Sequence, residues 1–287
     1  MSVTFYPNYT QYTGFAAATE PTIAGESWTA SDGTADNGSE GKPAFDIADN
    51  RRTNVLTIDT NSASTTIPIR VDVSASHINN FAIIDNHNLK SAGALFDIEQ
   101  GGANITLTTS HSGALGAALG LDSAPGTPDL DGITLVKFDS AADTQWEVEL
   151  DPDGGTYNAD ITIGEIVFGF SKTPAFNPEL QPTFGYDMPG GSYRESEGGQ
   201  RYGFSTHTNV RRSWRLMWKY MSDTNKADLE FVFKLTIGTR NPFYIDLSGP
   251  LGAATPQLFY VRFMKPLSFT GLTKDAWQVS VDIEEEI

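Results

Sequence analysis

The chain has 287 residues, 39% of them hydrophobic, and a formal net charge of −17. This hydrophobic share is enough for a folded core and argues against intrinsic disorder. The absence of cysteine excludes disulfides, thiolate nucleophiles and zinc sites with sulfur ligands. Residues 1–160 carry 6 Lys and Arg against 22 Asp and Glu, whereas residues 161–287 carry 13 against 14. The first region therefore lacks the cationic face that binding to a nucleic-acid backbone requires.

Neither a membrane span nor a secretory signal is expected. No apolar run approaches the roughly 20 residues that a spanning helix needs. The first residues, MSVTFYPNYTQYTG, lack the basic and apolar regions of a signal peptide. The sequence therefore predicts no membrane insertion and assembly in the cytoplasm.

Residues 1–40 are rich in Ser, Thr, Gly, Ala and acidic residues, so we expect an extended N-terminal arm with a strand near Ser2–Tyr6. Residues 41–170 contain short apolar or alternating runs separated by turn residues. These runs are Pro68–Val73, Phe81–Ile84, Ala94–Glu99, Asn104–Thr109, Ile133–Phe138, Trp146–Leu150 and Ala159–Phe170. Short strands at this spacing predict a β-sandwich.

Residues 171–199 contain four prolines and five glycines and predict a loop or linker between two domains. The domain that follows, residues 200–287, begins with the clearest strand, Arg211–Met221. Its alternation predicts one face carrying Trp214, Leu216, Trp218 and Tyr220. Ser222 is suited to cap a helix that ends near Leu235. Further strands are expected at Pro242–Leu247, Leu258–Phe263 and Trp277–Ile283, which gives a second β domain with one flanking helix.

Motifs for catalysis or cofactor binding are missing. There is no nucleophile elbow, metalloprotease helix, phosphate-binding loop or dinucleotide fingerprint, and GALGAALG at 113–120 has the wrong spacing for a phosphate cradle. The acidic stretches 129–132 and 151–155 resemble parts of calcium loops but lack the later ligands, so conformational turns are the preferred interpretation. The sequence predicts no catalytic, cofactor-binding or metal-binding residues and no cofactor.

The four histidines are His77, His87, His111 and His207, and none lies two or four residues from another. A metal pair formed by His77 and His87 across adjacent strands remains an alternative. The loop at 85–93 has no aromatic residue that could stack on a sugar. From the residues alone, the preferred interpretation of His87 is a histidine whose ring fills a loop by hydrogen bonding.

A basic stretch interleaved with aromatics precedes the predicted helix. Such a stretch can bind nucleic acid, but the strand alternation places Trp214 and Trp218 on the core face. Two interpretations stay open: a solvated strand face, and a positive interface that meets the acidic region of another copy. The residues assigned to this interface are Arg194, Arg201, Arg211, Arg212, Arg215 and Lys219, together with the terminal Glu284, Glu285 and Glu286.

Three stretches carry a resemblance to a known fold family: FDIADNRRTNVLTID (45–59), IPIRVDVSASHINNFAIIDNHNLKSAGALFDIE (67–99) and WEVELDPDGGTYNADITIGEIVFGF (146–170). Together they resemble a galactose-binding-like, discoidin-type jelly roll. Their order, followed by the Pro/Gly-rich segment and the Arg-aromatic strand, resembles virion proteins of tailed bacteriophages. The second half is similar to tail-tube and distal tail proteins, which implies a second β-sandwich or barrel with one flanking helix. In distal tail proteins, however, the ring-forming domain usually comes first.

The resemblance implies a non-enzymatic structural protein of a phage virion, in the tail tip or baseplate. It also implies that His87 is structural and caps a strand end, while Asn86 and Asn88 satisfy backbone groups. It implies that the protein assembles as a homo-oligomer with other virion tail proteins as partners, using the arm 1–40 and the loop 191–199. A host-surface glycan is a further candidate partner, and a sequence-specific nucleic acid is not expected. Two other functional classes stay open: a carbohydrate-binding module for host attachment and a hydrolase that uses a carboxylate pair.

Overall fold

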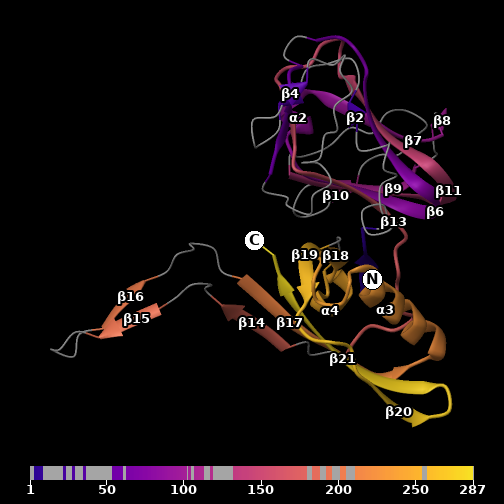
Figure 1. Cartoon of the computed structure of the whole chain (residues 1–287), viewed down its shortest axis with the longest axis vertical. Coiled ribbons are helices and arrows are strands. Elements are labelled where there is room, and N and C mark those ends of the chain that lie inside the picture. The colour runs from indigo at the N-terminus through magenta and orange to yellow at the C-terminus, as the bar shows by residue number, and fades with distance from the viewer. Residues whose placement is uncertain are drawn as a thin grey trace. The chain divides into compact units, whose positions relative to one another are not determined.

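The computed structural model divides into two compact units (Figure 1). The N-terminal unit comprises Tyr6–Ser171 with Thr255–Gln257, and the C-terminal unit comprises Met1–Phe5, Lys172–Ala254 and Leu258–Ile287. The structure describes residues 3–8, 22–23, 28–29, 35–36, 54–60, 63–101, 103–104, 107–112, 117–118, 132–179, 183–187, 192–195, 201–204, 211–253 and 257–286. Within these ranges, no helix has the length and apolar character needed to cross a membrane.

The described residues of the N-terminal unit form two antiparallel sheets. One has eight strands in the order β10-β9-β11-β6-β13, with β2 beside β6, β7 beside β11, and β8 beside β7; the other has the order β12-β5-β3-β4. The strands of the first sheet are β2 (Thr22–Ile23), β6 (Ile67–His87), β7 (Ala94–Gln100), β8 (Ala103–Asn104), β9 (Leu107–Ser112), β10 (Ala117–Ala118), β11 (Gly132–Pro152) and β13 (Glu165–Gly169). Those of the second are β3 (Trp28–Thr29), β4 (Ala35–Asp36), β5 (Leu56–Ile58) and β12 (Ile161–Ile163). A short helix, α2 (Leu89–Ala92), follows β6.

Two 21-residue strands, β6 and β11, form the backbone of this unit. Their pairing is interrupted by register shifts between Lys137 and Ala141 and between Asp143 and Gln145. Such irregularities bend a strand and increase its twist. The bend brings Phe138 and Trp146 of the same strand into a stacked contact, with 5.7 Å between ring centroids. The polar residues 74–80, expected as a break between two strands, therefore belong to one continuous strand.

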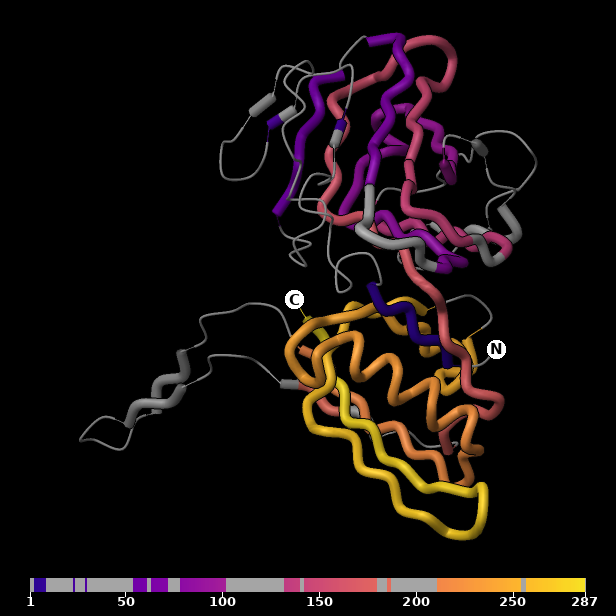
Figure 2. Tube along the Cα trace, turned by 45° about the vertical axis from the view of Figure 1, so that its right-hand side comes forward, coloured from indigo at the N-terminus to yellow at the C-terminus, as the bar shows by residue number. Residues whose placement is uncertain are grey.

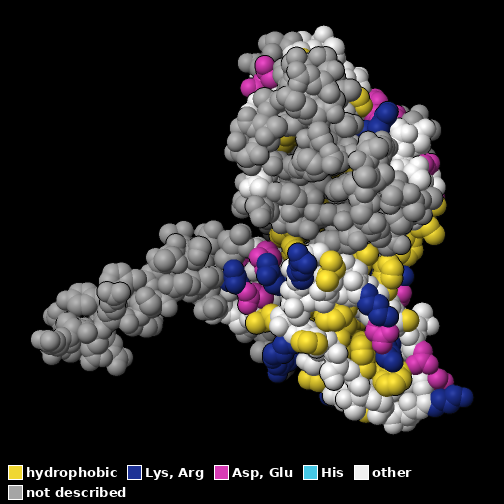
Figure 3. Space-filling model, in the orientation of Figure 1, with side chains coloured by type: hydrophobic (Ala, Val, Ile, Leu, Met, Phe, Trp, Pro, Cys, Tyr) yellow, Lys and Arg dark blue, Asp and Glu magenta, His cyan; other side chains and the backbone are white. Residues whose placement is uncertain are grey.

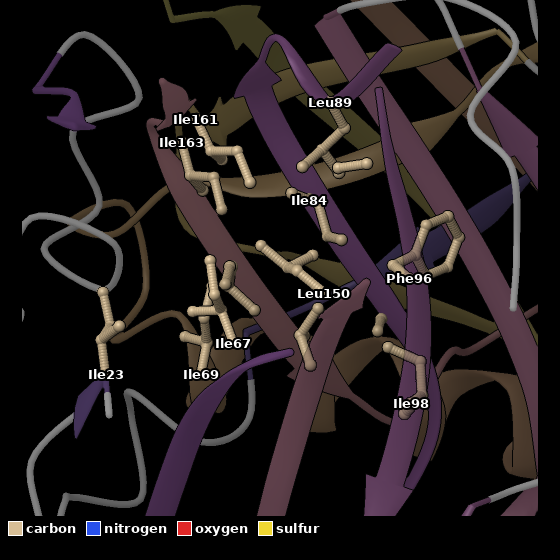
Figure 4. Close-up of a cluster of buried hydrophobic side chains, with 14 of the residues drawn as sticks. Ile23, Ile67, Ile69, Ile84, Leu89, Phe96, Ile98, Leu150, Ile161 and Ile163 are labelled. Carbon is tan, nitrogen blue, oxygen red and sulfur yellow. The ribbon is translucent and has the colours of Figure 1, made fainter. Parts of the chain in front are cut away.

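The buried side chains of both sheets meet in one hydrophobic cluster. Ile161 and Ile163 enter it from β12, Ile67 and Ile69 from β6, and Phe96 from β7, as Figure 4 shows. Burying the inner faces of two antiparallel sheets against each other is the defining arrangement of a β-sandwich. The predicted sandwich in this part of the chain is confirmed.

The C-terminal unit is built on a seven-stranded sheet with the order β1-β18-β19-β21-β17-β14, in which β20 also pairs with β21. Its strands are β1 (Thr4–Tyr6), β14 (Thr183–Asp187), β17 (Arg211–Met221), β18 (Phe243–Asp246), β19 (Leu258–Phe263), β20 (Phe269–Thr273) and β21 (Ala276–Glu285). A separate hairpin pairs β15 (Ser192–Glu195) with β16 (Arg201–Phe204). Figure 2 shows the β20–β21 hairpin in yellow.

Helix α3 (Asp223–Leu235) lies where the sequence predicts the flanking helix. The Ser222 hydroxyl accepts a hydrogen bond from the Asn225 backbone N–H at 3.3 Å, which satisfies one of the unpaired donors of the first turn. Leu229 and Val232 join the core of the sheet. A four-residue helix, α4 (Ser248–Leu251), follows β18. The predicted mainly β fold class, with a flanking helix in the second half, is confirmed.

Strand β1 lies in the C-terminal sheet although it is encoded near the start of the sequence. Phe5 exchanges two backbone hydrogen bonds with Lys172, each 2.9 Å long. Its ring packs against Phe243, with 6.0 Å between centroids. Residues 1–40, expected as an arm, thus contain β1 to β4, and residues 171–199, expected as a loop, contain β14 and β15. Of these strands, β1 lies where a strand was expected, near Ser2–Tyr6. The others have two to five residues and carry too little periodicity to be recognised within irregular sequence.

One face assignment on β17 is wrong. Trp214, Leu216 and Trp218 are buried as predicted, but the Tyr220 side chain is 72% exposed. The pairing of β17 with β21 shifts register between Trp218 and Met221. An irregularity of this kind reverses the inward and outward alternation, so Met221 enters the core in place of Tyr220.

Candidate functional site

His87 is held inside the N-terminal unit by both ring nitrogens. Its Nδ1 accepts a hydrogen bond from the Leu89 backbone N–H at 3.2 Å, and its Nε2 lies 2.9 Å from the Thr134 hydroxyl. Asn88 bridges two backbone groups: its amide nitrogen donates to the Asp160 carbonyl, and its oxygen accepts from the Thr162 N–H. The ring is almost fully buried. The structural interpretation of His87 is confirmed.

The metal pair of His77 and His87 is not formed across adjacent strands, because both residues lie on β6. In the ladder with β11, His77 pairs with Asp143 and His87 with Gly132. His111 lies on β9, opposite Leu135. His207, the acidic stretch 129–131 and most of residues 113–120 lie outside the described residues.

The acidic stretch 151–155 begins in the last two residues of β11 and continues as a turn over residues 153–155. The Asp151 carboxylate accepts a hydrogen bond from the Thr66 hydroxyl at 2.5 Å. Gly154 and Gly155 have φ values of 85° and 109°, which L side chains rarely adopt. The stretch thus serves the conformational role that was preferred in the sequence.

Carboxylates gather on one face of the N-terminal sheet, where β7 and β11 pair. Oxygens of Glu99, Glu147 and Glu149 lie within 4.8 Å of one another. These are the described residues that could offer several ligands to a metal ion. Arg70 contacts Glu147 at 3.0 Å and offsets one of the three charges. The sequence shows the alternating acids of each strand, but the pairing that brings them together is a tertiary feature.

Crowding on this acidic face raises carboxyl pKa values. Partial burial, followed by the charge of Asp151, raises the pKa of Asp97. Partial burial, followed by the charges of Glu99 and Asp151, raises the pKa of Glu149. In both cases the folded state favours the protonated carboxyl. The resulting stability is therefore present at low pH and is lost as the pH rises through the raised pKa.

Replacing Glu149 with glutamine is expected to raise the melting temperature of the N-terminal unit at pH 7, because it removes a charge that the folded state disfavours. The gain should disappear when the pH falls below the ordinary glutamate value of 4.5. Thermal unfolding of both proteins at pH 7 and pH 4 measures the difference. Asp153→Asn, at an exposed turn position, is the matched control for loss of one negative charge. An equal gain at both pH values would contradict the electrostatic cause.

The predicted interface residues on β17 and β21 form ion pairs within the chain. Arg211 contacts Glu284 at 2.5 Å. Arg212 donates two hydrogen bonds to Glu285, at 2.7 and 2.5 Å. Lys219 pairs with Glu179, and Glu286 pairs with Arg262. Figure 3 shows basic and acidic side chains interleaved on the visible face of the C-terminal unit.

The pairs of Arg211 with Glu284 and of Arg212 with Glu285 arise because β17 and β21 are antiparallel neighbours, with Ser213 opposite Glu284 and Arg215 opposite Asp282. The other two pairs join β17 to the segment before β14, and the residue after β21 to β19. The sequence finds the charged residues but not the register that joins them. Arg194 and Arg201 lie on the hairpin strands β15 and β16, opposite Tyr202 and Glu195. Contact of any of these residues with another copy of the chain stays a prediction.

A pocket of about 440 Å³ opens in the C-terminal unit beside the end of β17. We call it the aromatic pocket; its lining residues are Phe176, Asn177, Glu179, Met217, Trp218, Lys219 and Tyr220. The side chains of Phe176 and Tyr220 are 68% and 72% exposed. Exposed rings that line one concavity are available to pack against a ligand.

The wall of the aromatic pocket is fixed by backbone contacts. The Trp218 indole N–H donates to the Phe176 carbonyl at 2.9 Å, and the Glu179 N–H donates to the Met217 carbonyl at 2.8 Å. The Asn177 side-chain oxygen accepts from the Val3 N–H at 3.0 Å. The Glu179 hydrogen bond raises the pKa of Lys219, which keeps this pocket cation charged. Sequence reasoning missed the pocket because Phe176 lies in the Pro/Gly-rich segment.

A second pocket, of about 340 Å³, adjoins the middle of β17. We call it the charged pocket; its lining residues are Gly185, Ser213, Trp214, Arg215, Met264, Lys265 and Asp282. Arg215 and Lys265 both contact the Asp282 carboxylate, at 2.6 and 2.8 Å. Hydrogen bonding, first from Arg215, lowers the pKa of Asp282 to about 2. A Cβ at Gly185 would lie 2.4 Å from the Ser213 hydroxyl, so a larger residue there would require that hydroxyl to move.

No family model and no curated protein matches this chain. Among solved structures, chitosan-binding module 1 of a chitosanase/glucanase from Paenibacillus sp. IK-5 is 15% identical, covering 51% of this chain and 96% of its own, with a TM-score of 0.30. CBM32-3 from a family 31 glycoside hydrolase of Clostridium perfringens is 11% identical, with coverages of 44% and 81% and a TM-score of 0.29. A putative α-L-fucosidase from Bacteroides thetaiotaomicron is 10% identical, with coverages of 53% and 28% and a TM-score of 0.30. These TM-scores carry no argument about function.

Proposed function

We propose that this protein binds saccharides without acting on them, and that the aromatic pocket is its binding site. The observation that carries the proposal is the pair of exposed rings, Phe176 and Tyr220, in a pocket that also holds the Lys219–Glu179 ion pair. The C–H face of a sugar packs on an aromatic ring, while its hydroxyls need donors and acceptors. The pocket supplies both kinds of contact, as small-molecule sites generally do.

The ion pair suits a sugar hydroxyl, which both donates and accepts hydrogen bonds. The Lys219 ammonium can donate to the hydroxyl oxygen, and the Glu179 carboxylate can accept from the hydroxyl hydrogen. Glycoside hydrolysis by the usual mechanisms needs two facing carboxylates. Glu179 is the one carboxylate among the described residues that line the pocket. This chemistry favours binding over the hydrolase alternative.

The virion setting predicted from the sequence would give saccharide binding a role in attachment to a host. A tail-tip or baseplate protein present in many copies would present many identical pockets to host-surface glycans. Linked sites raise overall affinity by about 10²–10⁴ without any new contact, so a weak single pocket would suffice. This setting rests on the sequence resemblance and calls for its own test. The solution mass by light scattering should reveal a closed homo-oligomer, whereas a strict monomer would count against self-assembly.

The binding proposal is tested by a glycan array, followed by calorimetry with the best ligand. Phe176→Ala and Tyr220→Ala should each weaken binding about tenfold, which corresponds to about 1.4 kcal/mol of lost ring contact. Tyr186→Ala is the matched control, because Tyr186 is 75% exposed in the same unit but does not line the pocket. The proposal fails if no glycan binds, or if Tyr186→Ala weakens binding as much as the pocket variants do.

A further inference from the structure

The charged pocket lies beside the aromatic pocket along β17. Arg215 lines the first and Met217 lines the second, and these residues are two positions apart on the same strand. Two residues of a strand span about 7 Å. Arg215 and Met217 also point to the same side, opposite the buried Trp214 and Leu216. A ligand longer than one ring can therefore reach both pockets.

The charged pocket has an excess of positive charge. It contains two cations, Arg215 and Lys265, and one carboxylate, Asp282. Asp282 stays ionised at neutral pH because its pKa lies at about 2. Glu284 lies opposite Ser213 on β21, and its carboxylate contacts Arg211. The local balance is thus positive on a chain whose net charge is −17.

Both cations keep donors that Asp282 does not use. Arg215 directs Nε and Nη2 to Asp282, at 2.6 and 3.1 Å, whereas a guanidinium carries five N–H donors. Lys265 donates one hydrogen bond from Nζ to Asp282 at 2.8 Å, whereas an ammonium carries three N–H donors. Both side chains are more than half exposed, so these donors are accessible to a ligand. Guanidinium and ammonium groups are the usual protein partners of carboxylates and sulfates.

We propose that the ligand is an acidic saccharide whose carboxylate or sulfate binds Arg215 and Lys265 while a neighbouring sugar ring occupies the aromatic pocket. This inference rests on the proposed function and specifies its ligand class. Asp282 orients the two cations and Ser213 offers a hydroxyl at the pocket wall. Because the cations are exposed, their contribution is screened by salt.

The test compares oligosaccharides that differ only in the acid group, by calorimetry on the full chain. One pair is an oligogalacturonate and its methyl ester; the other is a sulfated oligosaccharide and its desulfated form. In 20 mM salt the acidic member should bind about three- to tenfold tighter, and the preference should shrink in 500 mM salt. The pair that shows the preference tells whether carboxylate or sulfate is the recognised group.

Arg215→Gln and Lys265→Gln should each reduce the preference for the acidic member. Lys274→Gln is the control, since it removes an exposed positive charge from the same unit outside both pockets. Equal binding of acidic and neutral members by the wild-type chain overturns this inference but leaves saccharide binding standing. Failure to bind either member, when the glycan array is also blank, overturns both. The wild-type comparison needs no variant and does not depend on how well a variant folds.

Discussion

Phe5→Ala is expected to lower the free energy of unfolding of the C-terminal unit by about 3–5 kcal/mol, the usual cost of truncating a buried phenylalanine. The Phe5 side chain is 1% exposed. Its ring lies 6.0 Å from that of Phe243 and 6.5 Å from that of Trp218, centroid to centroid. Truncation therefore leaves a cavity between β1 and the rest of the sheet, next to a residue that also lines the aromatic pocket.

Urea unfolding, with hydrogen exchange to localise the effect to β17, β18 and β21, measures this loss. Phe176→Ala is the matched control: it is the same chemical change in the same unit, at a side chain that is 68% exposed. Surface substitutions of this kind usually stay within about 0.5 kcal/mol. Equal effects of the two substitutions would show that β1 adds no packing energy to the sheet.

Trp146→Ala should have a similarly large effect on the N-terminal unit, about 3–5 kcal/mol. Trp146 is fully buried, and its ring lies 5.7 Å from that of Phe138 and 5.6 Å from that of Phe168. Its indole N–H donates to the Asp143 carbonyl at 3.3 Å, across the irregular part of β11. The residue thus packs the bend of β11 against Phe168 of β13, which lies beyond β6 in the same sheet.

The comparison with Trp146→Phe separates packing from the indole hydrogen bond, because phenylalanine keeps most of the ring contact. We expect Trp146→Phe to lose less stability than Trp146→Ala. Ile78→Ala, at a position 52% exposed on β6, serves as the surface control. Hydrogen exchange should report the loss in β6 and β11. A cost for Trp146→Ala no larger than that for Ile78→Ala would show that the bend is held by other contacts.

Local patterns predicted most of the regular structure. The runs at Ala94–Glu99 and Trp146–Leu150 lie within β7 and β11, and the helix predicted after Ser222 is α3. These succeed because alternation and capping are encoded within a few residues. Tyr220 was misplaced because an irregular pairing, created by a partner strand about 60 residues away, reverses the alternation.

The candidate site was less predictable than the fold. The charged residues of β17 and β21 are visible in the sequence, but their ion pairs depend on a register between distant strands. The acidic face depends in the same way on the pairing of Glu147 with Glu99. Phe176 gives no local signal at all, since exposure of an aromatic residue is decided by what packs around it. The sequence identifies the residue types that such sites use, but it does not show which of these residues lie together in the fold.

The position of β1 also has a consequence for synthesis on the ribosome. Its partner β18 begins at Phe243, so the ribosome adds nearly 240 residues between the two strands. At the usual 5–20 residues per second, this takes roughly 12–48 s. The N-terminal unit has time to fold in that interval. In the C-terminal unit, by contrast, β1 is synthesised first and stays without its partner until β18 has been made. Fusion partners attached next to β1 should therefore slow the maturation of the C-terminal unit more than that of the N-terminal unit.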